Sequence, residues 1–127
     1  MAKNTTTVKA SDKEIAPIKI KGINDSSEFY LLEFNRASVK FAEGQGFKVQ
    51  ALEDGISIGA IEELFFYAFR MHQPKMTKAQ TDKILYEDLG GMPEGMLERL
   101  VNLYLLPFST LVQTEDQAKN ARLTVEF

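Results

Sequence analysis

The sequence of 127 residues contains no cysteine and no tryptophan, and it has a single histidine, His72. Without cysteine the chain can form no disulfide bond and offers neither a thiolate zinc ligand nor a thiol nucleophile. A single histidine removes the metal sites that need two imidazoles and leaves little material for a Ser/His/Asp triad. These absences favour a non-enzymatic protein, and we expect no catalytic residue, no cofactor and no metal site.

Long apolar segments are also missing. The apolar runs are interrupted by Glu62, Glu63 and Arg70, or by Pro107, and are too short to span a bilayer. The first ten residues, MAKNTTTVKA, are polar and lack the apolar region of a secretory signal. We therefore expect no membrane partner and a cytoplasmic location.

Charge is unevenly distributed along a chain whose net charge is −3. Residues 1–22 carry five lysines against Asp12 and Glu14, a sum of +3, which leaves −6 on the remainder. An acidic chain is a poor ligand for phosphates, and a helix-turn-helix drawn through residues 77–106 would begin its second helix with Glu94, so we expect no nucleic-acid partner. The basic start could instead contact the acidic body of a neighbouring copy, in a head-to-tail contact that does not close.

The N-terminal part has the pattern of a β-hairpin. Residues 14–21 (EIAPIKIK) alternate isoleucine with lysine, and Pro17 restricts this strand to the edge of a sheet. The turn-forming GINDSS sequence follows, and residues 28–34 (EFYLLEF) read as a second strand. Because an isolated hairpin is marginal in water, we expect it to pack on another element.

The rest of the chain has helical periodicity, so we predict a mainly α (α+β) fold: an N-terminal β-hairpin packed on a cluster of about four helices. The expected helices are residues 36–44 with Asn35 as N-cap, 56–73, 78–89 with Thr77 as N-cap, and 94–112 with Pro93 at the first position and a kink or break at Pro107. The predicted organisation is a disordered lead (1–12), one globular domain (13–112), and a polar C-terminal tail or short strand (113–127).

Two apolar regions are candidate contact surfaces. Phe66 lies on the narrow polar arc of helix 56–73, and an aromatic surrounded by charge is typical of an interface anchor; alternatively, the hairpin or the N-terminal arm covers it. The segment Leu103–Leu111 is apolar nearly all round, which favours self-association or a partner over a pure core role. The residues assigned to partner binding or self-association are Phe66, Phe69, Glu63, Arg70, Leu103, Leu105, Leu106 and Phe108.

His72 is the remaining candidate for catalysis. No serine or acid stands at a motif spacing beside it, so we expect a role at the C-terminal end of its helix. The adjacent pair Glu62 and Glu63 point about 100° apart on a helix and form no ready two-carboxylate site.

Three stretches of the chain resemble the small tail assembly chaperones of long-tailed phages and prophages of Gram-positive bacteria. They are YLLEFNRASVKFAEGQGF (30–47), LFFYAFRMHQPKMTKAQTDKIL (64–85) and YEDLGGMPEGMLERLVNLYLLPF (86–108). The resemblance implies a helical, non-catalytic adaptor that coats the tape measure protein and recruits tail tube protein. It also implies a homo-oligomer located in the host bacterial cytoplasm and absent from the mature virion.

Many genes of these chaperones also encode a longer product by ribosomal frameshifting, which would diverge here within residues 113–127. An alternative of another class stays open: a small dimeric regulatory or structural interaction domain of a prophage. A third hypothesis, an enzyme with His72 as base, has the least support from the sequence.

Overall fold

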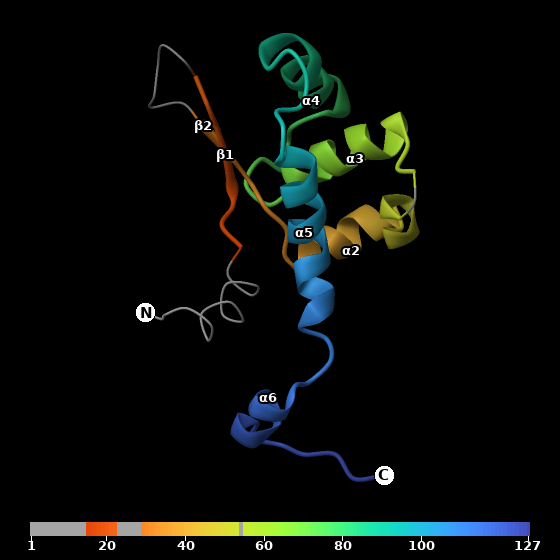
Figure 1. The fold of residues 1–127 in the computed structure, drawn as a ribbon, viewed down its shortest axis with the longest axis vertical. Helices are drawn as coiled ribbons and strands as arrows, with labels where there is room; N and C mark the ends of the chain where they lie inside the picture. The colour runs from red at the N-terminus through yellow and green to blue at the C-terminus, as the bar shows by residue number, and fades with distance from the viewer. Residues whose placement is uncertain (1–14, 23–28, 54) are drawn as a thin grey trace.

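A computed structural model describes residues 15–22, 29–53 and 55–127 (Figure 1). In chain order the elements are β1 (Ile18–Lys21), β2 (Phe29–Leu32), α2 (Arg36–Gly44), the 3-10 turn η1 (Val49–Leu52), α3 (Ile58–Ala68), α4 (Lys78–Lys83), the π-helical turn η2 (Ile84–Asp88), α5 (Met96–Ser109) and α6 (Glu115–Asn120). This arrangement confirms the predicted α+β class, a hairpin followed by helices. The expected disordered lead, residues 1–12, lies outside the described residues.

The hairpin predicted from the isoleucine–lysine alternation is present. Strands β1 and β2 pair antiparallel, with Ile18 opposite Leu32 and Ile20 opposite Tyr30. Leu32 is fully buried, and the backbone N–H of Glu33 donates to the carbonyl of Ala68 over 3.2 Å. The hairpin is thereby attached to the end of α3, as its marginal stability in isolation requires.

Side-chain caps fix where the helices begin. Asn35 Oδ1 accepts from the N–H of Ser38 over 2.8 Å, and the Ser38 hydroxyl accepts from the N–H of Asn35 over 2.9 Å. Thr77 and Gln80 form the same reciprocal capping box at the start of α4. Both N-caps were predicted from the sequence, because Asn and Thr satisfy amides that the first helical turn leaves unpaired.

The third helix is shorter than the predicted range of 56–73. Ser57 caps α3, and the helix ends at Ala68 rather than at Gln73. The amides of His72 and Gln73 both donate to the carbonyl of Phe69, over 3.2 and 2.7 Å, so the chain turns there. Pro74 follows and removes the next backbone donor, which is why a helix cannot continue through this segment.

The predicted helix 78–89 divides into α4 and η2. The amide of Leu89 donates to the carbonyl of Ile84 over 2.8 Å, a spacing of five residues that widens the last turn. The predicted start of the next helix at Glu94 is wrong: α5 begins at Met96, after Gly95 with φ 86°. A left-handed residue cannot lie within a right-handed helix, so Pro93 belongs to the preceding turn.

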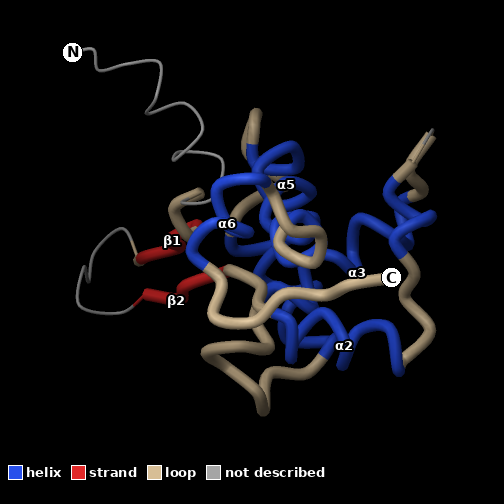
Figure 2. The backbone as a smooth tube through the Cα atoms, turned by 90° about the horizontal axis from the view of Figure 1, so that it is seen from below, coloured by secondary structure: helices blue, strands red, loops and turns tan. Residues whose placement is uncertain are grey.

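Helix α5 continues through Pro107 and ends at Ser109. The C-terminal segment, predicted as a polar tail or short strand, contains the separate helix α6 with Thr114 as its N-cap. Residues 121–127 form no regular element. Figure 1 shows α6 and the C-terminus lying beyond the end of α5, away from the hairpin. Seen from below, the helices gather beside the hairpin (Figure 2).

The core is aromatic and centres on Tyr104 of α5, which is fully buried. The ring of Tyr104 lies 4.9 Å from Phe34, 5.4 Å from Phe47 and 5.9 Å from Phe108, centroid to centroid. Its hydroxyl oxygen is the buried side-chain polar atom that has no hydrogen-bond partner among the described residues. Burial raises the pKa of Tyr104 to about 12, and the charge of Glu43 adds to the effect.

We predict that Tyr104→Phe stabilises the protein, because the change removes a desolvated hydroxyl and keeps the ring. The free energy of unfolding, from urea denaturation, should rise by about 1 kcal/mol. Tyr67→Phe is the matched control, since the Tyr67 hydroxyl is not among the buried unpaired atoms. A loss of stability specific to Tyr104→Phe would show that the hydroxyl has a bonding partner.

Stability should also fall at alkaline pH through Tyr104. The folded pKa of about 12 lies above the ordinary value of 10.0, so the folded state holds this proton more tightly than the unfolded state. The contribution is complete below pH 10 and is lost as the pH rises toward 12. Urea denaturation between pH 9 and 11.5 should show a smaller decline for Tyr104→Phe than for the unchanged protein; equal declines would contradict this assignment.

Candidate functional site

The first predicted contact, Phe66 on α3, is half-buried. It lines a small hollow of about 30 Å³ together with Phe41, Arg70 and Met76. The guanidinium of Arg70 lies 3.8 Å over the ring of Phe41 and also donates to the carbonyl of Pro74 over 3.1 Å. Among the described residues, the covering elements are therefore α2 and the turn after α3, and not the hairpin that the sequence had suggested as one alternative. The N-terminal arm, the other alternative, lies outside the described residues.

Phe69 was assigned to the same surface, and that assignment is wrong. Its side chain is fully buried, with the rings of Phe65 and Tyr30 at 5.1 and 5.6 Å. The helix ends at Ala68, so the turn directs Phe69 inward instead of along the polar arc. Glu63 remains exposed on α3, and its charge, after burial, helps raise the pKa of Tyr67.

The second predicted surface, the C-terminal half of α5, divides between core and exterior. Leu103 is only 2% exposed and belongs to the core, so its assignment to partner contact is wrong. Leu105 is 36% exposed, and Leu106 and Phe108 are half-buried. The physical reason is that α5 packs against α3 and α2 and places Leu103 and Tyr104 in the buried core, while the side chains of its next turn are only partly covered.

Grooves flank this end of α5 where it meets α2. One hollow of about 200 Å³ is lined by Val39, Pro107, Phe108 and Leu111, with the charged Lys40 at its rim. A second, of about 450 Å³, lies beside Leu106 and Pro107. Arg36 lines both hollows, so they are neighbouring parts of one largely apolar surface, whose charged lining residues are Arg36, Lys40 and Glu43.

Exposed apolar side chains continue along the chain from α5 to the C-terminus. Six of the ten large apolar residues that are exposed among the described residues follow Tyr104. They are Leu105, Leu111, Val112, Leu123, Val125 and Phe127. Sequence reasoning did not assign the last three, although their alternation with Arg122, Thr124 and Glu126 is a recognisable strand pattern.

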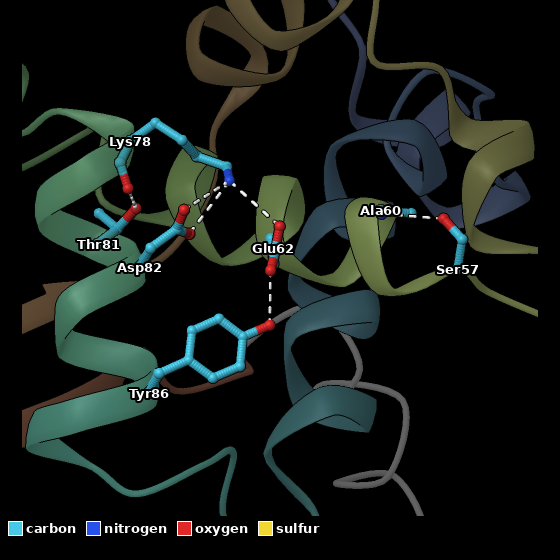
Figure 3. A network of polar contacts seen from close by, with 7 residues as sticks. All are labelled: Ser57, Ala60, Glu62, Lys78, Thr81, Asp82 and Tyr86. Carbon is cyan, nitrogen blue, oxygen red and sulfur yellow. Dashed lines mark hydrogen bonds and ion pairs between the residues drawn. The ribbon is translucent and has the colours of Figure 1, made fainter.

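A polar network links α3 to α4 and η2 (Figure 3). Lys78 Nζ lies 3.0 and 3.1 Å from the carboxylate oxygens of Asp82 and 3.4 Å from Glu62 Oε1. The Tyr86 hydroxyl donates to the other oxygen of Glu62 over 2.6 Å. Every charge in the network has a partner, so it fastens two helices together.

The pKa shifts in this network favour a structural role. Desolvation lowers the pKa of Lys78, but the hydrogen bonds and charges of Asp82 and Glu62 outweigh it and the pKa is raised. A nucleophilic lysine needs the opposite shift. The hydrogen bond from Tyr86 lowers the pKa of Glu62, against a smaller desolvation effect, so this carboxyl is a poor general acid at neutral pH.

The sequence had suggested that the side chain of His72 interacts with the C-terminal end of its helix. In the structure this side chain contacts Glu33 instead. Its Nε2 lies 2.5 Å from Glu33 Oε2, on the segment between β2 and α2. The pair is distant in sequence and could not be found from spacing. It joins the hairpin to the turn after α3, next to the backbone bond between Glu33 and Ala68.

Within residues 15–22, 29–53 and 55–127, no three histidine, aspartate or glutamate side chains are grouped as metal ligands. In the same residues, none of the helices has the length and apolarity that crossing a bilayer requires.

The chain matches, over residues 1–127, a protein family described as a domain of unknown function (DUF5055). It belongs to this family. Searches of curated proteins and of solved structures returned no match. The description assigns the family no activity.

We predict that Tyr86→Phe raises the pKa of Glu62, because it removes the hydrogen bond that contributes most to the lowering. Glu62 stabilises the fold above its unfolded pKa, and this contribution is lost as the pH falls through its folded value. Carboxyl ¹³C chemical shifts followed by NMR should show the change. Lys78→Gln is the comparison and should also raise this pKa, because it removes the favourable charge of the ammonium group; no change in either variant would contradict the network.

Proposed function

We propose that this protein is a non-catalytic phage tail assembly chaperone that binds the tape measure protein and recruits tail tube protein. The carrying observation is the apolar surface at the C-terminal end of α5, where Leu111 is exposed and lines one α2–α5 groove, and Leu106 is half-buried and lines the other. The resemblance of the chain to such chaperones suggests that the tape measure protein is the client. The apolar surface offers a physical means of binding it.

The grooves suit an amphipathic helix. An apolar stripe of a client helix can cover Leu106, Pro107 and Phe108, which the chain itself leaves half-buried. Arg36 and Lys40 at the margin can contact acidic side chains that border such a stripe. A tape measure protein is a long, mostly helical chain, so repeated binding of this kind would keep its apolar stripes from aggregating.

A non-catalytic role has support from the polar side chains. The two groups that sequence reasoning could have placed in a catalytic role, Glu62 and His72, are each occupied by structural partners. The acidic charge of the chain and its exposed apolar residues also fit a protein that acts by binding.

The test is co-expression of the chain with the tape measure protein encoded by the same genome. We expect the chain to raise the soluble fraction of that client several-fold and to co-purify with it. Leu106→Ser combined with Leu111→Ser should remove this effect, because both side chains line the proposed surface. Ile58→Ser is the matched control: this residue is 72% exposed, on the first turn of α3.

An unchanged soluble fraction with the unmodified chain would contradict the proposal. If the chain instead forms a discrete dimer and leaves the client insoluble, the alternative of a prophage interaction domain gains support. The gene offers an independent check, since a slippery heptanucleotide before the stop codon and a long helical reading frame downstream are expected for a chaperone of this kind.

A further inference from the structure

We propose that the C-terminal segment 121–127 of one copy adds as a β-strand to the free edge of β1 in a second copy. The donor is the sequence ARLTVEF, and the acceptor is the groove between β1 and the start of α5. The inference goes beyond the proposed function, because it concerns self-association, and it does not depend on the identity of the client.

The donor segment has the pattern of a strand without a partner. Leu123, Val125 and Phe127 alternate with polar residues; Leu123 and Val125 are 70% and 79% exposed, and Phe127 is fully exposed. No backbone hydrogen bond joins residues 122–127 to the described part of the chain. A half-buried strand needs one apolar face covered and its amides paired, and the chain supplies neither within these residues.

The acceptor is the unpaired edge of a two-stranded sheet. In the described residues β1 pairs with β2 alone, so alternate backbone groups on its other side are unpaired. A groove of about 650 Å³ lies along this strand, bounded by Leu89, Met96 and Arg99. An extended segment placed there would continue the sheet, as in other cases of β-augmentation.

The two faces of the added strand match those of β1. Ile18 and Ile20 are half-buried, while Lys19 and Lys21 are exposed on the opposite face. If Leu123, Val125 and Phe127 of the donor lie on the same face as the two isoleucines, these side chains cover the apolar part of the groove. Arg122 and Glu126 of the donor would then share the outer face with the two lysines. In the register that places Glu126 opposite Lys19, Arg122 lies four residues away and opposite neither lysine, and the pair of opposite charges stabilises the neighbouring strands.

The geometry favours a second copy over the same chain. The groove lies at the N-terminal end of α5, whereas the donor follows its C-terminal end. A helix of 14 residues separates the two ends by about 20 Å, and Figure 1 shows the C-terminus pointing away from the hairpin. A donor at one end and an acceptor at the other give a head-to-tail assembly that can grow without closing.

Disulfide trapping tests the contact directly, because the chain has no cysteine of its own. A protein with the substitution Lys19→Cys is mixed with a protein of different mass that carries Glu126→Cys, and the mixture is oxidised. We expect the mixed dimer to dominate. The matched control replaces Lys19→Cys by Lys40→Cys, whose position is exposed at the α2–α5 groove. Equal or greater trapping at position 40 would overturn the proposal and place the tail in that groove.

A chain carrying both substitutions, Lys19→Cys and Glu126→Cys, distinguishes the source of the strand. Oxidised at low micromolar concentration, it should yield dimers and larger species. A product that is only an internally closed monomer would overturn the assignment to a second copy.

Deletion of residues 121–127 should lower the mass measured by light scattering to that of a monomer, with far-UV circular dichroism unchanged. Reversing the charges with Lys19→Glu and Lys21→Glu should weaken assembly, and adding Glu126→Lys should restore it. Unchanged oligomers after the deletion would overturn this inference while leaving the client experiment valid. If the client stays insoluble but the disulfide between positions 19 and 126 still forms, the proposed function is contradicted and this inference is not.

Discussion

The packing of α5 across α3, through the aromatic cluster around Tyr104, is the interaction on which the rest of the structure depends. Phe34 brings the end of the hairpin to this cluster, Phe47 brings the segment after α2, and Phe108 extends it along α5. Edge-to-face rings fill space at the crossing without a disulfide bond, which a chain lacking cysteine cannot form. Because one cluster unites all these segments, a protein this small can form one core.

The same cluster determines which surfaces stay available. Tyr104 and Leu100 direct one face of α5 inward, and the helix then continues through Pro107 beyond the elements that could cover it. The next apolar side chains are consequently half-buried or exposed. The C-terminal part of α5 extends beyond the elements that cover it. This extension leaves the surface proposed for client binding exposed, and it places the tail proposed for self-association beyond the core.

Much of the local structure could be predicted from the sequence. The hairpin followed from period-two alternation, and the starts of α2 and α4 followed from Asn35 and Thr77. Contacts between distant segments could not be predicted in this way. A helical wheel placed Phe69 on a surface because it assumed that α3 continues to Pro74, but the helix ends at Ala68 and the turn reverses that side chain. Glu33 and His72 are far apart in the sequence, and only the tertiary fold brings them into contact.

The sequence by itself determined the fold class, the starts of α2 and α4 and the absence of thiol chemistry, because these depend on residue type and short-range spacing. Only the tertiary structure decided which apolar residues are covered. Leu103 and Leu105 are equally apolar and two positions apart, yet one is buried and the other is exposed. Burial depends on what the remainder of the chain brings to each side of a helix, and that is a property of packing, not of local pattern.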